Sequence, residues 1–267
     1  MSGDYEILAP VYETLHLASF AQAATPRLLD YAQRNDWMGR RIIDLGCGTG
    51  TSLHWLAKRG YVTAGVDNSS DMLNIARVNL ATASLSVHLI EEDIRQLEVH
   101  DDYDMAIALN LFNEFESLRD LEAAFKRVNA LLAPQRLFIF DMLTIEGLIK
   151  TGTRGAQVAH DDPTRLTVIE SNQFDYERQE LVRSYKIFRY ESYAWHRSDA
   201  TWTRRAYPVQ AVATLLNRRG FEVVAVLDPA FTVYDPRTTS ELRAVASAIT
   251  DEGTVSIPRV FFIARNQ

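Results

Sequence analysis

The chain has 267 residues, of which 47% are hydrophobic and 24% charged, enough for one large domain or a domain with an insertion. Its 28 basic and 35 acidic residues give a net charge of -7, which disfavours nucleic acid and anionic membranes as partners. The single cysteine, Cys47, excludes an intrachain disulfide, and no two histidines stand four residues apart, so we predict no metal site. No apolar run approaches the roughly 20 residues of a membrane helix, and the first six residues hold two acids and no base. We therefore expect a cytoplasmic protein without a signal peptide.

The first part of the chain alternates helical and strand patterns. Residues 1–36 are helical in pattern, and Pro26 is expected to open a second helix at its first turn. From residue 40 onward, short apolar runs alternate with amphipathic stretches. We predict strands at 41–45, 61–66, 85–90, 103–109 and 136–140, and helices at 51–59, 71–80 and 118–132. Continuous apolar strands between helices predict an α/β fold with a parallel sheet covered on both faces.

The hydrophobic pattern changes after residue 140. Alternating, aromatic-rich runs predict an antiparallel β insertion, at 165–174, 181–191 and 201–207. The core pattern then resumes with a helix at 208–219, strands at 221–227 and 260–264, and a helix at 239–249. We therefore expect a core of residues 1–150 and 207–267, whose first part forms a helical cover, with residues 151–206 as an inserted lid.

The sharpest feature is the run Asp44-Leu45-Gly46-Cys47-Gly48-Thr49-Gly50, which follows the first predicted strand and opens a helix. Glycine lets the backbone turn tightly and approach a ligand where a Cβ would clash. Asp67 lies at the end of the next strand, where a carboxylate can accept hydrogen bonds from ribose hydroxyls. Together these features predict a nucleoside-containing cofactor at the carboxyl ends of the first two strands.

The spacing of the glycines distinguishes between cofactors. A dinucleotide fingerprint requires glycine at position 51, where this chain has Thr51. A dinucleotide also needs its pyrophosphate on a helix N-terminus, whereas Asp44, two residues before the first glycine, suits a cation-bearing ligand. A nicotinamide-dependent oxidoreductase is therefore the disfavoured alternative, and a cofactor-binding protein without transferase activity stays open.

These residues resemble the class I S-adenosylmethionine-dependent methyltransferase family over about residues 36–142. The matching segments are 43–50, Gly65-Val66-Asp67-Asn68-Ser69, Met72-Leu73, Glu92-Asp93-Ile94, 104–110 and Leu131-Leu132-Ala133-Pro134. The resemblance implies a Rossmann-like, mostly parallel sheet of seven strands with the last strand antiparallel. It also implies S-adenosyl-L-methionine as the cofactor and S-adenosyl-L-homocysteine as the product.

The resemblance further implies a role for each matching position. The Asp44 region with Gly46 and Gly48 is expected to hold the methionine part of the cofactor, and Asp67 the ribose. The other implied cofactor-binding residues are Cys47, Gly50 and Asn68 in the two loops, Met72 with Leu73 beside the adenosine, Asp93 at the adenine amino group, Ile94 at its ring, and Asn110 and Leu111 near the reacting methyl. We expect Cys47 to fill space in the loop and not to act as a nucleophile.

Two tyrosines precede the core. Tyr5 and Tyr12 stand seven residues apart, about two helical turns, which places both rings on one helix face. They resemble a pattern in small-molecule members of the family, where such a tyrosine covers the cofactor and points at its sulfonium. Plain packing beside Leu8 and Leu15 is the alternative.

The acceptor is harder to predict. The β insertion resembles that of members that methylate amines on nucleotide-linked sugars, where it forms a lid and a dimer surface, so we expect a small-molecule acceptor and consider a homodimer. No His–Asp pair is evident as a general base, which favours N-methylation, or O-methylation assisted by a carboxylate. The candidate catalytic residues are Tyr12, Glu114 and His196. The fourth strand ends in Asn110-Leu111-Phe112-Asn113 and lacks the Asn/Asp-Pro-Pro-aromatic sequence of enzymes that act on adenine amines, so DNA is not the expected acceptor.

Overall fold

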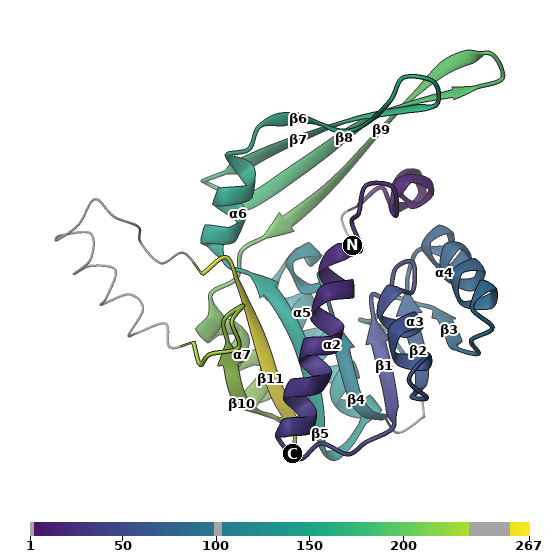
Figure 1. The fold of residues 1–267 in the computed structure, drawn as a ribbon. Helices are drawn as coiled ribbons and strands as arrows, with labels where there is room; N and C mark the ends of the chain where they lie inside the picture. The colour runs from purple at the N-terminus through teal and green to yellow at the C-terminus, as the bar shows by residue number, and fades with distance from the viewer. Residues whose placement is uncertain (1–2, 99–102, 235–256) are drawn as a thin grey trace.

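The computed structural model describes residues 3–98, 103–234 and 257–267. Two β-sheets form its framework, one of seven strands in the order β10-β11-β5-β4-β1-β2-β3 and one of four in the order β6-β7-β8-β9 (Figure 1). The strands of the large sheet are β1 (Arg41–Leu45), β2 (Val62–Asp67), β3 (His88–Glu91), β4 (Tyr103–Ala108), β5 (Leu132–Leu143), β10 (Phe221–Leu227) and β11 (Arg259–Asn266). Within the described residues, no helix is both long and apolar enough to cross a membrane.

The large sheet is parallel except at β11. Strand β11 runs antiparallel to β5 and to β10, whereas the pairs from β3 through β5 are parallel. The register pairs Asp44 of β1 with Gly65 of β2 and with Ile107 of β4. The carboxyl ends of these three strands therefore meet at one edge. The predicted Rossmann-like, mostly parallel sheet of seven strands is confirmed.

Helices cover both faces of this sheet. Ile42 of β1 packs in one buried cluster with α2 (Ser19–Arg34) and α3 (Thr51–Ala57). The next residue, Ile43, points into the opposite cluster with α5 (Leu118–Leu131) and α7 (Val209–Arg218). Helix α4 (Ser70–Thr82) packs on α3 through Leu53 and Leu73. Because both faces are covered, neighbouring residues of a strand are both apolar, which is why the strands read as continuous apolar runs.

The prediction that Pro26 opens a second helix is wrong. Helix α2 continues through Pro26, which stands inside it. Proline has no N–H to donate, yet the Thr25 hydroxyl donates to the carbonyl oxygen of Ala21 at 2.7 Å one turn earlier. The buried residues Leu28 and Leu29 hold the helix on the sheet, so packing outweighs the local cost of proline.

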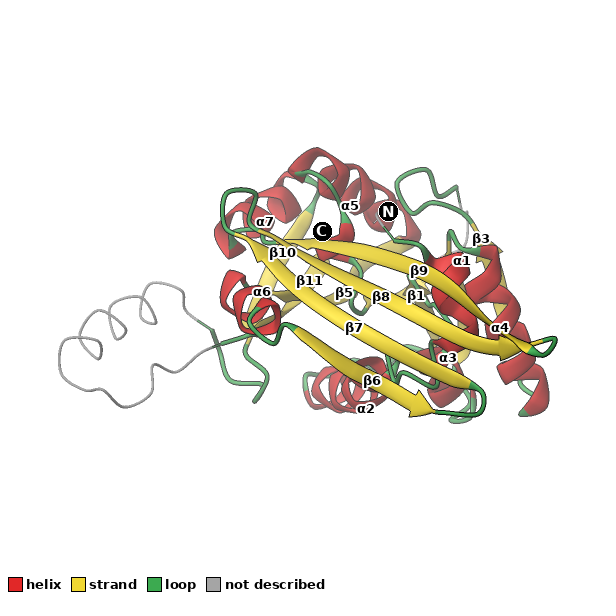
Figure 2. Cartoon of the chain, turned by 90° about the horizontal axis from the view of Figure 1, so that it is seen from above, coloured by secondary structure: helices red, strands yellow, loops and turns green. Residues whose placement is uncertain are grey.

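The insertion is an antiparallel sheet, as predicted, with one strand and one helix more than expected. Its strands are β6 (Ala156–Asp162), β7 (Leu166–Asp175), β8 (Glu180–Glu191) and β9 (Ala194–Arg205), and helix α6 (Ile145–Gly152) leads into them. Strand β6 is mostly exposed, so it lacks the apolar alternation that marks a half-buried strand. Figure 2 shows the four strands crossing over the large sheet. The predicted strand 136–140 is part of the longer β5, and the helix predicted at 239–249 lies outside the described residues.

The N-terminal segment packs against the insertion. Helix α1 (Tyr5–Leu8) and the 3-10 turn η1 (Ala9–Val11) place Leu8 and Val11 in a buried cluster with residues of α6, β7, β8 and β9. The Asp4 carboxylate accepts hydrogen bonds from the Thr201 backbone N–H at 2.8 Å and from its hydroxyl at 3.0 Å. The N-terminal segment and the insertion therefore form one structural unit above the large sheet.

Candidate active site

The glycine loop follows β1 and has the backbone geometry that the sequence predicts. Gly46, Gly48 and Gly50 all have positive φ angles, of 72°, 52° and 82°. A Cβ on Gly46 would lie 2.8 Å from a methyl of Leu111, too close for any side chain. A Cβ on Gly48 would meet only the Met72 methyl, at 4.0 Å. The loop therefore leaves open space beside Gly48, where a ligand can approach the backbone.

Asp67 stands at the end of β2 and anchors this loop. Its Oδ2 accepts a hydrogen bond from the Gly48 N–H at 2.8 Å, and its Oδ1 accepts one from the Ser69 N–H at 2.9 Å. Burial raises the pKa of Asp67 above its ordinary value, although these backbone bonds oppose the shift. Each carboxylate oxygen can accept a further hydrogen bond, so the ribose role predicted for Asp67 fits its position.

Asp44 lies under the same loop and is only 2% exposed. Among the described residues, no hydrogen-bond or ion-pair partner for its carboxylate is present. Burial, and secondarily the charge of Asp67, hold the pKa of Asp44 well above its usual range. A buried carboxylate without a partner is costly, and a cationic ligand would remove this cost. The residues present therefore fit a ligand that carries an ammonium or sulfonium group.

Two small cavities meet at the glycine loop, and we call them together the cofactor cavity. Their volumes are about 50 and 40 Å³. Predicted site residues that line one or both are Tyr5, Tyr12, Asp44, Gly46, Cys47, Gly48, Asp67, Met72, Asn110, Leu111 and Glu114. Small-ligand pockets usually hold about 300–1,000 Å³, so a nucleoside can enter only if the walls move. Tyr12, like Gly46, Gly48 and Asn110, lines both cavities.

Glu114 belongs to the short 3-10 turn η2 (Phe112–Glu114) that follows β4. Its carboxylate is 3% exposed, accepts a 2.5 Å hydrogen bond from the Tyr5 hydroxyl, and lies 3.5 Å from Arg204 Nη2. Burial raises the pKa of Glu114, although Arg204 and Tyr5 oppose the shift. The predicted catalytic residues Tyr12 and Glu114 thus line the same cavity, together with an arginine from the insertion.

Asn110 lies two residues after the end of β4 and has a left-handed backbone conformation, with a φ of 60°. Its backbone N–H donates to Asp141 Oδ1 at 2.7 Å, and its side-chain oxygen accepts a hydrogen bond from Arg259 Nη1 at 2.8 Å. Arg259 also pairs with Asp141 and stacks over the ring of Phe20 at 3.7 Å. A residue other than glycine keeps this conformation where surrounding contacts enforce it, so this network fixes Asn110 beside the cofactor cavity.

A third cavity, of about 290 Å³, lies between the N-terminal segment, the insertion and the large sheet. We call it the arginine-lined cavity after Arg154, Arg183, Arg204 and Arg259, which line it. It shares five lining residues with the cofactor cavity, namely Tyr5, Tyr12, Leu17, Asn110 and Arg204. A ligand in one cavity would therefore contact the wall of the other.

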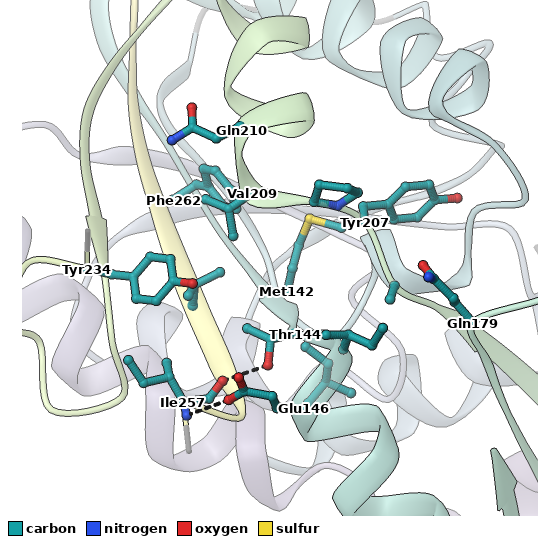
Figure 3. Close-up of a pocket in the computed structure, with 15 residues that line it drawn as sticks. Met142, Thr144, Glu146, Gln179, Tyr207, Val209, Gln210, Tyr234, Ile257 and Phe262 are labelled. Carbon is teal, nitrogen blue, oxygen red and sulfur yellow. Dashed lines mark hydrogen bonds between the residues drawn. The ribbon is translucent and has the colours of Figure 1, made fainter. Parts of the chain in front are cut away.

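A larger cavity, of about 390 Å³, lies elsewhere, between β5, β11 and the start of α7 (Figure 3). Its wall includes Met142, Tyr207, Tyr234 and Phe262, and the Glu146 carboxylate accepts a hydrogen bond from the Ile257 N–H at 3.1 Å. None of the residues predicted to form the site lines it. Size alone therefore does not identify the site in this chain.

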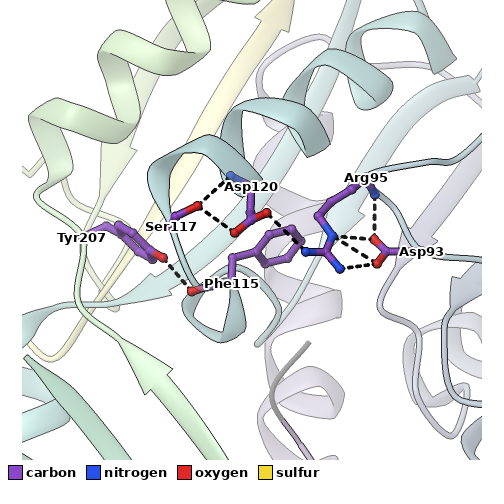
Figure 4. Close-up of polar contacts among 6 residues, drawn as sticks. All are labelled: Asp93, Arg95, Phe115, Ser117, Asp120 and Tyr207. Carbon is purple, nitrogen blue, oxygen red and sulfur yellow. Dashed lines mark hydrogen bonds and ion pairs between the residues drawn. The ribbon is translucent and has the colours of Figure 1, made fainter. Parts of the chain in front are cut away.

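Several predicted residues lie outside these cavities. Asp93 is held by Arg95 at 2.5 Å, and Arg95 also reaches Asp120 at 3.2 Å (Figure 4). This hydrogen-bonded pair lowers the pKa of Asp93, and an adenine contact would require Arg95 to release one oxygen. Ile94 packs in the core beside α5, and Asn68 is exposed next to Asp67. Gly50 caps helix α3 from within the loop.

His196 does not join the other candidate catalytic residues. It lies exposed on β9, paired in register with Arg189 near the far turn of the β8–β9 hairpin. It lines neither the cofactor cavity nor the arginine-lined cavity. Cys47 lies buried against Leu53 and Leu73, and burial with the nearby carboxylates Asp44 and Asp67 raises its pKa. This packing agrees with a space-filling role.

Three polar residues of the site were missed in the sequence: Arg204, Asp141 and Arg259. Each lies near one end of a strand, and no spacing in the sequence links it to the glycine loop. Glu13 carried a weak signal because it follows Tyr12, and its carboxylate accepts a 2.5 Å hydrogen bond from the Thr49 hydroxyl in the loop.

Comparisons with known proteins agree with this geometry. The family described as "Methyltransferase domain" matches residues 42–135. YqeM of Bacillus subtilis (strain 168), whose name assigns it provisionally to the methyltransferases, is 25% identical over 203 residues, which are 75% of this chain and 81% of that protein.

Two solved structures share the fold. An S-adenosylmethionine-dependent methyltransferase from Clostridium acetobutylicum ATCC 824 superposes with a TM-score of 0.74 at 20% identity, over 98% of each chain. The structure of CalS10, an amino pentose methyltransferase from Micromonospora echinaspora with S-adenosylmethionine bound, gives 0.63 at 15% identity, over 94% of this chain and 96% of that one. The sequence match covers the glycine loop and Asp67, and the structural matches extend the same fold over the insertion. Residues 42–135 thus match a methyltransferase-domain family, and the chain shares the fold of solved S-adenosylmethionine-dependent methyltransferases.

Proposed function

We propose that the protein binds S-adenosylmethionine at the glycine loop and transfers its methyl group to a nitrogen or oxygen atom of a small molecule in the arginine-lined cavity. One observation carries the proposal, namely that the two cavities share a wall that includes Tyr5, Tyr12, Asn110 and Arg204. A donor bound at the loop and an acceptor bound under the insertion would meet at this wall, which supplies the alignment that methyl transfer requires.

The residues of the cofactor cavity divide according to the parts of the cofactor. Asp44 would hold the ammonium group of the methionine part, because it is buried and has no partner among the described residues. Asp67 would accept hydrogen bonds from the ribose, and Met72 and Leu111 provide apolar walls. The adenine contact proposed for Asp93 depends on Arg95 moving aside.

In this proposal the chain aligns the cofactor with the acceptor and takes up the proton that the acceptor loses. When bound, the cofactor would supply a methyl group on a sulfonium, so that the acceptor atom can bond to the methyl carbon while the carbon–sulfur bond breaks and S-adenosylhomocysteine leaves as a neutral thioether. Glu114 can accept the proton that the acceptor loses, because burial raises its pKa above that of an exposed glutamate. The Tyr12 hydroxyl has no hydrogen-bond partner among the described residues and can orient the cofactor or the acceptor. His196 lines neither the cofactor cavity nor the arginine-lined cavity, so we assign it no role in this proposal.

Amine and hydroxyl acceptors are both compatible with a carboxylate base. The fold shared with CalS10, an amino pentose methyltransferase, supports an amino-sugar as one specific acceptor. The dimer predicted through the insertion stays a prediction. Exposed aromatic side chains lie at the β8–β9 turn, where Tyr193 is 95% exposed and Trp195 47% exposed, and light scattering would measure the mass directly.

Two measurements test the proposal. Calorimetry should show binding of S-adenosylmethionine that weakens about tenfold or more in Asp67→Ala, because a lost hydrogen-bond partner in a site costs about 1–3 kcal/mol. Asp71→Ala, an exposed carboxylate four residues later, is the matched control and should bind as the wild type does. Release of S-adenosylhomocysteine is then screened against amino-sugars, small amines and phenols. Cofactor binding without release on any of them would favour the alternative of a binding protein without transferase activity.

A further inference from the structure

The arginine-lined cavity has a charge opposite to that of the chain. The protein carries a net charge of -7, yet this cavity is lined by four arginines and one carboxylate, Glu170. A positive cavity in an acidic protein is not an effect of overall composition. The arginines therefore serve either to bind a ligand or to hold the walls together. Arginines that form ion pairs with the wall serve the second purpose, and an arginine without an ion pair is available for the first.

Three of the four arginines are neutralised by the fold. Arg183 pairs with Glu170 at 3.5 Å and donates from Nε to the Asn172 side-chain oxygen at 2.6 Å. Arg204 pairs with Glu114, and Arg259 pairs with Asp141. These arginines hold carboxylates of the wall in place, so they add donors to the cavity but little net charge.

Arg154 differs from the other three. It follows α6 and lines the cavity with an exposed side chain, and its guanidinium has no ion-pair or hydrogen-bond partner among the described residues. In the same cavity, the Nε atom of Arg204 is buried and also lacks a hydrogen-bond partner within the described part of the chain. A buried donor without an acceptor costs free energy unless a ligand supplies one. The cavity therefore offers one uncompensated positive charge and one unused buried donor.

We infer that the arginine-lined cavity binds an acceptor that carries an anionic group, a carboxylate or a phosphate, and that Arg154 contacts this group. The inference rests on the proposed function for the placement of the acceptor. A planar guanidinium matches the oxygen pairs of both anions, and a charge-assisted hydrogen bond is stronger than a neutral one. The anionic group lies at Arg154, and the atom to be methylated lies toward the wall shared with the cofactor cavity. The acceptor class is thus an acidic small molecule with a nucleophilic nitrogen or oxygen.

The test uses two simple anions as probes on the full chain saturated with S-adenosylhomocysteine. Pyrophosphate and malonate are titrated at constant ionic strength, so that general screening is the same in every sample. We expect at least one anion to bind the wild type, and Arg154→Gln to weaken its binding about tenfold or more. Arg165→Gln is the matched control, because Arg165 is exposed in the turn between β6 and β7 and does not line the cavity. The anion that binds more tightly assigns the group as phosphate or carboxylate.

The outcomes separate this inference from the proposed function. If neither anion binds the wild type, or if Arg154→Gln binds both as tightly as the wild type, the inference is wrong. Equal loss in Arg154→Gln and Arg165→Gln would show a diffuse charge effect and would also overturn it. Binding of S-adenosylhomocysteine is measured first in the same samples. If S-adenosylhomocysteine does not bind, the proposed function itself is wrong. If it binds but Arg154→Gln does not change the affinity for either anion, only the inference of an anionic acceptor is wrong.

Discussion

The Tyr5 hydroxyl donates a 2.5 Å hydrogen bond to Glu114 Oε1, although the two residues stand 109 positions apart in the sequence. The bond attaches the N-terminal segment to the carboxylate that follows β4. It also stabilises the ionised form of Glu114, against the burial that raises its pKa. The position of α1 and the protonation of Glu114 are therefore linked, and the two tyrosines of the segment can be tested separately.

Tyr12→Phe and Tyr5→Phe are expected to differ. The Tyr12 hydroxyl has no hydrogen-bond partner among the described residues, so its loss should leave the melting temperature nearly unchanged. If this hydroxyl orients the cofactor or the acceptor, kcat/KM should fall about tenfold or more. Tyr5→Phe removes the 2.5 Å hydrogen bond to the buried Glu114 while the contact with Arg204 remains, and we expect this loss to cost about 1–3 kcal/mol of unfolding free energy. Equal kinetics for Tyr12→Phe and the wild type would show that Tyr12 only packs.

The pH dependence of the reaction should report on Glu114. As the pH falls through its raised pKa, the carboxylate becomes protonated and can no longer accept a proton, so kcat/KM should fall on the acid side at a pH above the ordinary value of 4.5. In Glu114→Gln this acid limb should disappear and the rate should drop about a hundredfold. Glu116→Gln, an exposed neighbour, should keep the wild-type profile. If Glu114→Gln keeps the wild-type fall in kcat/KM at low pH, that fall comes from the titration of another group.

The same shift has a consequence for stability. The folded state binds a proton at Glu114 more tightly than the unfolded state does, because the folded pKa is the higher one. The contribution to the unfolding free energy is therefore fully present below pH 4.5 and is lost as the pH rises through the raised pKa. Denaturant titrations across this pH range measure the unfolding free energy. Its dependence on pH should differ between the wild type and Glu114→Gln.

Asp44 should couple cofactor binding to proton release. Its pKa is held well above the usual range in the free protein, and a bound ammonium group would lower it again. Binding should therefore release a proton at pH values between the bound and the free pKa, and affinity should fall as the pH drops below the free value. Calorimetry in two buffers of different ionisation enthalpy measures this release. Asp44→Asn should abolish it, and a release that persists in this variant would contradict the assignment.

Arg259 is expected to act by positioning Asn110. Arg259→Lys keeps a charge beside Asp141 but loses the planar group that reaches both Asp141 and Asn110. We expect kcat to fall about tenfold, with the dissociation constant for S-adenosylmethionine little changed. Arg265→Lys, on the same strand but paired with Glu222, is the control and should have wild-type kinetics. Wild-type kcat in Arg259→Lys would show that the network serves stability alone.

The cofactor half of the site could be predicted because its signals are local. Positive φ angles demand glycine at Gly46 and Gly48, and the parallel sheet brings Asp67 to the same edge as Asp44. The acceptor half could not be predicted in the same way. Arg204 and Arg259 reach the site from strands whose alternation indicates only which face a residue occupies, and the ion pairs that hold them join distant segments.

The other differences also have physical causes. Strand β6 is exposed on most of its length, so its sequence has no apolar alternation that would predict a strand. Helix α2 continues through Pro26 because its packing on the sheet outweighs the local preference of proline for a first turn. The largest difference in organisation concerns the N-terminal segment: the sequence pattern groups it with the core, whereas in the structure it packs on the insertion. Leu8 and Val11 pack on the insertion, a contact that no pattern within residues 1–36 reveals.

That contact sets an order for folding. Leu8 and Val11 are made early in synthesis, yet the side chains that bury them, among them Leu148, Tyr185 and Trp202, follow much later in the chain. Closing so long a loop costs entropy before any contact forms, so such pairings tend to come late in folding. The large sheet can assemble while the N-terminal segment is still solvated, and the cover of the site is then the last part to become ordered. In a refolding experiment, amide protection at Leu8 should consequently lag behind protection in β1 and β4.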